Sequence, residues 1–301
     1  MNYYRNCTLC PRNCHINRLE KQGFCGCSYK IKVALALPFF YEEPPISGQN
    51  GSGAIFFSGC NLKCIFCQNH EISTNNFGKE ITITRLSEIM LELQEKKVHN
   101  INLVTPTMYI PSIIKAIKKA KKHGLNIPII YNSSGYESVE ALKLLDGYID
   151  VYLPDFKYFD DAKAFEYSGV KDYLANAKAS IEEMFRQTGP CQFNQDGYIQ
   201  KGVIVRHLIL PTLKEDSKKI IYYLYQKYHD DIYLSIMNQY TPNKRITKKE
   251  LEKPLSPQDY DEVIDYACDL GITKAFCQIG DTVKESFIPH FNLEGIKKIK
   301  K

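Results

Sequence analysis

The sequence predicts an α/β protein built from strand–helix units, preceded by a small cysteine-rich lobe. From residue 54 to residue 271, short apolar runs alternate with stretches that repeat apolar residues at helical spacing. Such alternation implies parallel strands joined by crossover helices. The chain has 301 residues, which suits one α/β barrel with an appendage, and eight of its 11 cysteines precede residue 68. Six units fit either an open doubly wound sheet or a partial barrel.

The first unit shows how each element is assigned. AIFFSG (residues 54–59) is an apolar run of strand length, and TRLSEIMLELQEKK (residues 84–97) has a helical apolar period behind a Thr84 N-cap. By the same criteria, further strands are expected at residues 101–106, 127–135, 148–158, 202–211 and 231–240. Further helices are expected at residues 109–124, 138–145, from about 172 onward, 217–229 and 256–271. Residues 275–292 are predicted to form a strand and a segment that closes the barrel.

Polar side chains fall at or near the carboxyl ends of these strands. Ligands of parallel α/β proteins gather at this edge, whether the sheet is open or closed. The candidate site at this edge comprises Cys60, Asn132, Asp155, Lys157, Arg206 and Gln239.

The composition excludes several classes of protein. The net charge of +5 results from 39 basic and 34 acidic residues, and many lysines fall on predicted helix faces, so nucleic-acid binding is not expected. The longest apolar run, Val33–Tyr41, is interrupted by Pro38 and is too short to span a bilayer, and the N-terminus has no apolar signal region. We therefore expect a cytoplasmic protein with no membrane partner, whose cysteines bind metal rather than form disulfides.

The segment SGCNLKCIFCQN (residues 58–69) places Cys60, Cys64 and Cys67 close together. Thiolates at this spacing can surround one metal centre, whereas disulfides between them would close strained rings. Three cysteines are one fewer than a closed zinc site or a fully ligated four-iron cluster needs. The metal centre is therefore expected to keep one coordination position open, and an open position indicates that the centre takes part in a reaction.

A second group of cysteines lies nearer the N-terminus, in CTLCPRNC and GFCGC. Zinc and an auxiliary iron–sulfur cluster both fit a four-thiolate site there, with Cys27 or His15 as a spare ligand. The predicted ligands are Cys7, Cys10, Cys14 and Cys25. Residues 1–50 form the predicted lobe, and residues 51–301 form the barrel domain. The scattered cysteines, expected to be buried small side chains, are Cys191, Cys268 and Cys277.

CNLKCIFC matches the C-x3-C-x2-C motif of the radical S-adenosylmethionine (SAM) superfamily, including the aromatic residue before the third cysteine. The strand rhythm over residues 54–240 resembles the partial (β/α)6 barrel of that superfamily, in which the motif also follows the first strand. Within it, the chain resembles the pyruvate formate-lyase activating enzyme family and relatives with an N-terminal cysteine-rich lobe. The resemblance implies a [4Fe–4S] cluster on Cys60, Cys64 and Cys67, with SAM on the fourth iron.

The resemblance also implies roles for residues outside the cysteine motif. Phe66 would lie against the adenine of SAM. Asp155 and Lys157 in LPDFKY match a D-x-K element whose lysine approaches the SAM carboxylate. Arg206 matches a strand arginine of the family, and Asn132 stands where the family has an aspartate that contacts the cofactor.

The chain departs from the family in two places. TPTM (residues 105–108) replaces a Gly-Gly-Glu element that binds the SAM amine, so we expect the hydroxyls of Thr105 and Thr107 and backbone carbonyls to accept from the ammonium instead. The extra cysteines precede the cluster motif, whereas glycyl-radical activating enzymes with extra clusters carry them after it.

The resulting hypothesis is an enzyme that cleaves SAM reductively to a 5′-deoxyadenosyl radical and abstracts a hydrogen atom. The substrate would be a residue of a partner protein, of the glycyl-radical type or another, and a flavodoxin or ferredoxin would supply the electron. Radical modification of a small molecule or peptide is one alternative. A non-catalytic metal-binding scaffold is another, and it would bind metal without consuming SAM.

Overall fold

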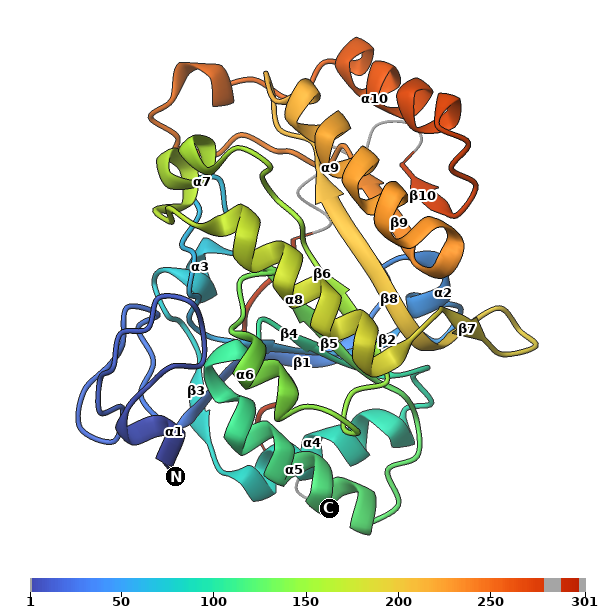
Figure 1. The fold of residues 1–301 in the computed structure, drawn as a ribbon. Coiled ribbons are helices and arrows are strands. Elements are labelled where there is room, and N and C mark those ends of the chain that lie inside the picture. Colours follow the sequence, from blue (N-terminus) through green and yellow to red (C-terminus); the bar gives the residue numbers. More distant parts are fainter. Residues whose placement is uncertain (1, 279–287, 298–301) are drawn as a thin grey trace.

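The structure, a computed structural model, describes residues 2–278 and 288–297. Its centre is a 10-stranded sheet in the order β10-β9-β8-β6-β5-β4-β2-β1-β3, with β7 paired to β8 (Figure 1). The strands are β1 (Ile31–Phe39), β2 (Ser52–Phe57), β3 (Lys79–Ile81), β4 (Ile101–Val104), β5 (Ile129–Ser133), β6 (Val151–Pro154), β7 (Gln192–Phe193), β8 (Ile199–Leu208), β9 (Tyr233–Met237) and β10 (Ala275–Cys277). The α-helices are α1 (Asn2–Arg5), α2 (Pro44–Ser47), α3 (His70–Ser73), α4 (Ile83–Glu95), α5 (Ile110–Lys122), α6 (Val139–Lys143), α7 (Asp161–Ser168), α8 (Tyr173–Thr188), α9 (Lys214–Tyr228) and α10 (Pro257–Asp269). The 3-10 helices are η1 (Thr107–Tyr109), η2 (His229–Asp231) and η3 (Lys249–Leu251).

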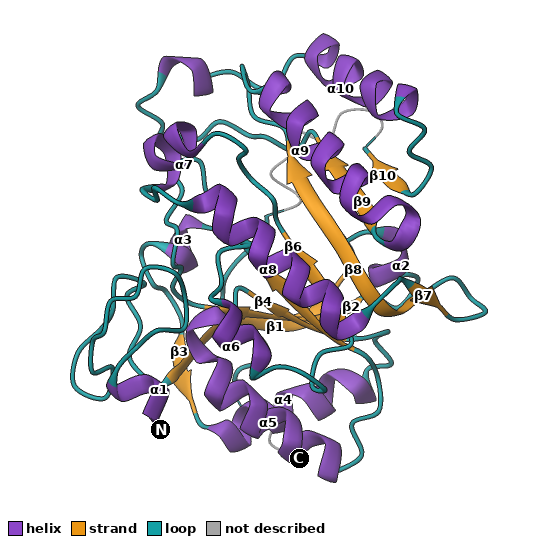
Figure 2. Ribbon diagram, viewed as in Figure 1, coloured by secondary structure: helices purple, strands orange, loops and turns teal. Residues whose placement is uncertain are grey.

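All six predicted strands are present, and they run parallel to one another. β2, β4, β5, β6, β8 and β9 pair in this order, and β10 continues the parallel arrangement beyond β9. At least one helix separates each strand from the next, and the longer helices lie over one face of the curved sheet (Figure 2). Within the described part of the chain, no pairing joins β10 to β3, so the sheet stays open as in a partial barrel. The predicted α/β fold is confirmed, and the carboxyl ends of its parallel strands share one edge.

The run that was too short for a membrane span forms β1, which the sequence analysis did not assign as a strand. β1 pairs antiparallel with β2 on one side and with β3 on the other. It lies inside the predicted lobe of residues 1–50, so part of that segment belongs to the sheet. The domain boundary at residue 50 stays a prediction.

No helix in residues 2–278 and 288–297 is long and apolar enough to cross a membrane.

Side-chain caps fix where several predicted helices begin. Ser138 accepts from the amide of Ala141 at the start of α6, and Ser256 accepts from Asp259 at the start of α10. The predicted Thr84 cap is wrong. Thr82 caps α4 instead, because its hydroxyl accepts from the amide of Arg85, and Thr84 lies within the first turn.

The chain before β1 packs on the same edge of the sheet as the carboxyl ends of β4 and β5. The hydroxyl of Tyr4 lies 2.9 Å from that of Ser112 in α5, and Ser138 donates to the carbonyl of Thr8 at 2.9 Å. No helix or strand forms between α1 and β1. The cysteine-rich segment is therefore held by contacts with the barrel rather than by regular structure of its own.

The predicted closing segment is only partly described. Its strand is confirmed as β10, whereas residues 279–287 lie outside the described residues. Beyond them, the ring of Phe291 lies 5.7 Å from that of Phe56 on β2, and the amide of Leu293 donates to the carbonyl of Ala34 on β1. The described C-terminal residues thus return to the antiparallel side of the sheet.

Candidate active site

A cavity of about 250 Å³ lies at the carboxyl edge of the parallel strands. Its wall includes the predicted site residues except Thr107: Cys60, Cys64, Phe66, Cys67, Thr105, Asn132, Asp155, Lys157, Arg206 and Gln239. They come from β5, β8 and the connections after β2, β4, β6 and β9. The cavity also borders Pro289. The structure therefore brings the predicted site residues together, as expected from strand ends that share one edge.

The three cysteines of the motif lie on the connection between β2 and α3. Gly59 begins it with a φ of 88°, and a Cβ at this position would lie 2.1 Å from the Sγ of Cys27, so only glycine fits. Lys63 has a φ of 61°, which turns the chain back between the first two cysteines. The loop thus curls around the cavity while it touches the N-terminal lobe behind it.

Each sulfur of the motif has a polar neighbour. The amide of Leu62 donates to Cys60 at 3.4 Å, the hydroxyl of Ser168 lies 2.9 Å from the Sγ of Cys64, and Cys67 lies 3.3 Å from the hydroxyl of Ser73. Hydrogen bonds to sulfur stabilise thiolates and tune the potential of iron–sulfur clusters. Across the described ranges, no three His, Cys, Asp or Glu side chains converge closely enough to hold a single metal ion. The three thiols border a larger space, which suits a cluster of several atoms.

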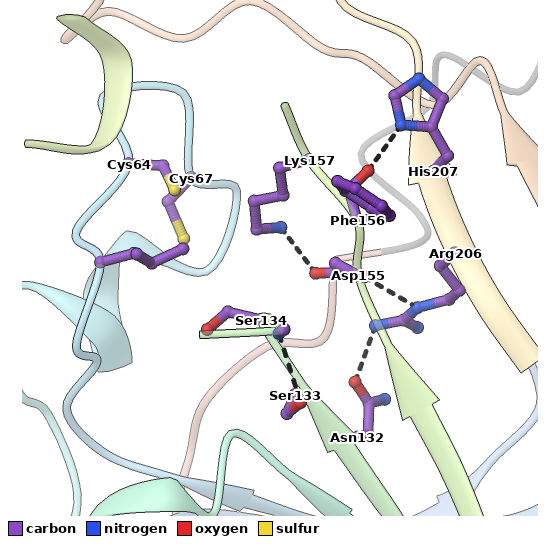
Figure 3. Close-up of polar contacts among 12 residues, drawn as sticks. Cys64, Cys67, Asn132, Ser133, Ser134, Asp155, Phe156, Lys157, Arg206 and His207 are labelled. Carbon is purple, nitrogen blue, oxygen red and sulfur yellow. Dashed lines mark hydrogen bonds and ion pairs between the residues drawn. The ribbon is translucent and has the colours of Figure 1, made fainter. Parts of the chain in front are cut away.

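A row of alternating charge crosses the cavity beside the cysteines (Figure 3). The Nζ of Lys157 lies 2.6 Å from Oδ2 of Asp155, and the Nε of Arg206 lies 3.0 Å from Oδ1 of the same carboxylate. The Nη2 of Arg206 donates to Oδ1 of Asn132 at 2.7 Å. Figure 3 shows Lys157 at the end of this row that faces the cysteine loop. Asp155 therefore positions both cations.

The electrostatics keep this row charged. Burial alone would raise the pKa of Asp155, but Lys157 and Arg206 outweigh it and hold the pKa below its usual range. Burial would lower the pKa of Lys157, but the Asp155 carboxylate raises it above the usual value. At neutral pH the ammonium is thus available for an anionic group of a ligand.

Glu42 is a site residue that the sequence analysis missed. Its Oε2 lies 3.1 Å from Nη1 of Arg206, and its Oε1 accepts from Nδ2 of Asn102 at 2.8 Å. Its side chain is only 7% exposed, and burial raises its pKa to about 7 despite Arg206. The available signal was an acidic pair, Glu42 and Glu43, directly after an apolar run that proves to be β1.

The threonines that replace the glycine-rich element have different positions. Thr105 borders the cavity with a φ of 57°, a conformation that β-branched residues rarely adopt, and its amide donates to the carbonyl of Asn132. Thr107 does not border this cavity, because its hydroxyl donates to Oε1 of the buried Glu137 at 2.8 Å. Burial raises the pKa of Glu137 to about 7. Of the two threonines, only Thr105 can meet a ligand in the cavity.

Apart from Cys27, the other cysteines divide into two sets. Four line a second, smaller cavity in the N-terminal segment: Cys7, Cys10, Cys14 and Cys25. The expectation of buried side chains is wrong for Cys268 and Cys277, which are exposed, and Cys191 is half-buried.

Phe66 is buried, with its ring 6.3 Å from that of Tyr240, so it forms an apolar part of the first cavity wall.

The fold and the site together define a partial α/β barrel with three thiols at the carboxyl edge of its parallel strands. The sequence model of the radical SAM superfamily matches residues 54–192. An uncharacterised protein of Methanocaldococcus jannaschii is 32% identical over 272 residues, which cover 84% of this chain and 74% of that protein. The pyruvate formate-lyase-activating enzyme of Clostridium pasteurianum is 24% identical over 180 residues, which cover 58% of this chain and 68% of that enzyme.

Two solved structures share the fold. A radical SAM methyltransferase from Sphaerobacter thermophilus aligns with a TM-score of 0.51 at 11% identity, over 75% of this chain and 65% of that one. SuiB from Streptococcus suis aligns with a TM-score of 0.50 at 15% identity, over 75% of this chain but only 48% of SuiB, so the chain spans about half the length of SuiB. The chain belongs to the radical SAM superfamily. Membership implies an enzyme that uses a [4Fe–4S] cluster and SAM.

Proposed function

We propose that this protein cleaves SAM reductively and abstracts a hydrogen atom from a residue of a partner protein. The observation that carries the proposal is one cavity shared by three motif cysteines and a charged row that ends in Lys157. A thiol-rich wall suits an iron–sulfur cluster, and a buried ammonium beside it suits the carboxylate of an amino acid. Together these groups match the two parts of the cofactor: the thiols suit the [4Fe–4S] cluster, and the ammonium suits the carboxylate of SAM.

The residues present fit this pair in number and in chemistry. Cys60, Cys64 and Cys67 would hold three irons, which leaves the fourth iron for the amino and carboxylate groups of SAM. Lys157 would bind the SAM carboxylate, and Phe66 would form the apolar wall beside the adenine. When bound, the pair supplies a 5′-deoxyadenosyl radical that takes a hydrogen atom from the substrate.

The protein-substrate part of the proposal rests on the similarity to the activating enzyme of C. pasteurianum. A low-potential one-electron donor such as flavodoxin or ferredoxin would reduce the cluster. A small molecule or peptide is the second substrate class to test, because superfamily membership alone does not select between them.

Anaerobic turnover tests the proposal. The protein, reconstituted with iron and sulfide and reduced with dithionite, should release 5′-deoxyadenosine from SAM and show a cluster electron paramagnetic resonance signal that SAM alters. Cys64→Ala should abolish both. Cys191→Ala is the matched control, because its half-buried thiol lies outside the cavity.

Binding of iron without any SAM response would leave the scaffold alternative standing. The substrate class is tested by mixing the reduced enzyme and SAM with candidate glycyl-radical proteins. A protein-based radical signal supports a partner protein. Release of 5′-deoxyadenosine without such a signal, but with conversion of an added peptide or small molecule, contradicts it.

A further inference from the structure

The N-terminal segment folds four cysteines around a cavity of its own, of about 20 Å³. Cys7, Cys10, Cys14 and Cys25 all line it. A Cβ on Gly23 would lie 3.4 Å from the Sγ of Cys25 and 3.7 Å from the Sγ of Cys14, so these two sulfurs face the same small space. Four cysteines thus border one small cavity, in a segment that has no helix or strand to hold them.

The two spare ligands considered from the sequence do not belong to this set. The thiol of Cys27 points to the carbonyl oxygens of Ser58 and Cys25, at 3.3 and 3.4 Å, and does not line the cavity. His15 is exposed, and its Nδ1 lies 2.9 Å from Oδ1 of Asn6. The cavity therefore selects four of the five lobe cysteines.

A buried cation beside these thiols requires an anionic partner. Arg18 is only 1% exposed, yet no carboxylate within the described residues forms an ion pair with it. Its guanidinium donates to the carbonyls of Cys27 and Met108, at 3.2 and 2.7 Å, and its Nη1 lies 3.8 Å from the Sγ of Cys7. Carbonyl oxygens satisfy its hydrogen bonds but do not compensate its charge.

Arg12 adds a second positive charge at the same cavity. It is half-buried, its Nη2 donates to the carbonyl of Ser168 at 3.3 Å, and it forms no ion pair with a carboxylate of the described chain. Four neutral thiols would leave the buried charge of Arg18 uncompensated, whereas the half-buried Arg12 also stacks on the ring of Phe24. Four thiolates around a metal centre carry a net negative charge, which these arginines would balance.

The spacing of the thiols distinguishes between the two metal centres that fit four thiolates. Zinc needs all four sulfurs at about 2.3 Å from one point, hence close to one another. In the part of the chain that the structure describes, no three such ligands converge in that way. A cubane cluster is several atoms wide and accepts sulfurs that stand farther apart. We propose that Cys7, Cys10, Cys14 and Cys25 hold a second [4Fe–4S] cluster, with Arg18 and Arg12 as its counter-charges.

The second cluster would lie close to the first. Asn61 lines the lobe cavity, whereas its neighbour Cys60 lines the barrel cavity. The Nε of Arg12 donates to the carbonyl of Asn61, so the lobe is bound directly to the cysteine loop. Two reduced clusters this close should couple magnetically, which gives a signature that does not depend on SAM cleavage or on any substrate.

Iron content tests the proposal in the anaerobically reconstituted full chain. About eight iron atoms per chain are expected, and about four in Cys10→Ala/Cys25→Ala, because each cubane holds four. This variant should keep the electron paramagnetic resonance signal of the barrel cluster and its response to SAM, which shows that the variant remains folded. The line broadening that magnetic coupling to the second cluster causes should disappear from this signal. Cys27→Ala is the matched control and should keep about eight.

A complementary variant isolates the lobe site. Cys60→Ala/Cys64→Ala/Cys67→Ala should retain about four iron atoms and a reduced-cluster signal that SAM leaves unchanged. One zinc atom per chain in place of this iron would overturn the cluster assignment. Retention of about eight iron atoms in Cys10→Ala/Cys25→Ala, or a wild-type lobe without any metal, would overturn the ligand set. None of these outcomes depends on whether the barrel cleaves SAM.

Discussion

The carboxylate of Glu42 lies 3.1 Å from the guanidinium of Arg206, although 164 positions separate them in the chain. The contact joins the segment after the antiparallel strand β1 to the parallel strand β8 across the cavity. Arg206 is at the same time the partner of Asp155 and Asn132. One guanidinium therefore holds three polar groups from three different parts of the sheet.

Because Arg206 is shared in this way, we expect substitutions of Glu42 and Arg206 to have strongly coupled effects on the free energy of unfolding. Arg206→Met should lower the free energy of unfolding by about 3 kcal/mol or more, because it leaves the buried carboxylate of Glu42 without its cation and that of Asp155 with Lys157 alone. Glu42→Gln/Arg206→Met should recover part of this loss, since one of those carboxylates is gone. Denaturant unfolding of the four proteins at pH 8, where Glu42 is ionised, measures the coupling. Strictly additive effects would show that the ion pair contributes nothing.

Lys157 should act on SAM binding rather than on cluster assembly. Removal of a charge-assisted hydrogen bond costs about 1.5–3 kcal/mol, so Lys157→Met should weaken SAM binding by about 10- to 150-fold. The iron content should stay at the wild-type level, because the lysine is no cluster ligand. Equilibrium binding of SAM to the reconstituted protein measures the effect.

Lys163→Met is the control for Lys157→Met, because Lys163 pairs with Glu166 on α7 and does not line the cavity. Unchanged SAM affinity in Lys157→Met would separate this lysine from the cofactor. A parallel loss of iron would instead indicate that the variant disturbs the cysteine loop.

The sequence predicted the parallel strands and the residues at their ends because both depend on local patterns. Apolar runs and helical periods define the six units, and strand topology then brings Asn132, Asp155 and Arg206 to one edge. Glu42 escaped prediction because its role depends on β1, whose pairing with β2 and β3 is a long-range contact. The cap of α4 was misplaced by two residues because Thr82 and Thr84 offer the same hydroxyl.

The roles of the two threonines could not be separated from sequence either. TPTM contains two hydroxyls at alternate positions, and nothing local indicates which one faces the cavity. The structure separates them through a distant residue, Glu137, which binds the hydroxyl of Thr107. It also shows the left-handed backbone of Thr105, a conformation that residue types with a β-branched side chain would not suggest.

Thr105 should carry backbone strain that glycine would relieve. A β-branched residue with a φ of 57° lowers the free energy of unfolding by about 1–3 kcal/mol through backbone strain. Glycine would relieve this strain, but its larger conformational entropy in the unfolded state offsets part of the stabilisation. Thr105→Gly should therefore raise the free energy of unfolding by about 0.5–1 kcal/mol. Thr107→Gly is the contrasting variant, because Thr107 has no positive φ and would lose its hydrogen bond to Glu137. A loss of stability in Thr105→Gly would mean that its side chain makes contacts worth more than the strain.

Glu137 should make the stability of the protein depend on pH in a direction opposite to that of a carboxylate in an ion pair. Its side chain is 1% exposed, and its partners are the hydroxyls of Thr107 and Ser133, at 2.8 and 3.1 Å. Burial raises its pKa from 4.5 to about 7 in the folded state. The folded protein therefore favours the neutral acid. Its contribution to stability is complete below pH 4.5 and is lost as the pH rises through 7.

The difference of pKa corresponds to about 3 kcal/mol, and Glu137→Gln should remove this pH dependence because the amide keeps both hydrogen-bonding positions without a charge. The free energy of unfolding of the wild type, relative to that of the variant, should fall by up to this amount between pH 5 and pH 8. Other titrating groups cancel in the difference, since the two proteins share them. Denaturant titrations at several pH values test the prediction. Parallel curves would place the pKa of Glu137 at its ordinary value, and a relative gain at high pH would indicate a cation near this carboxylate.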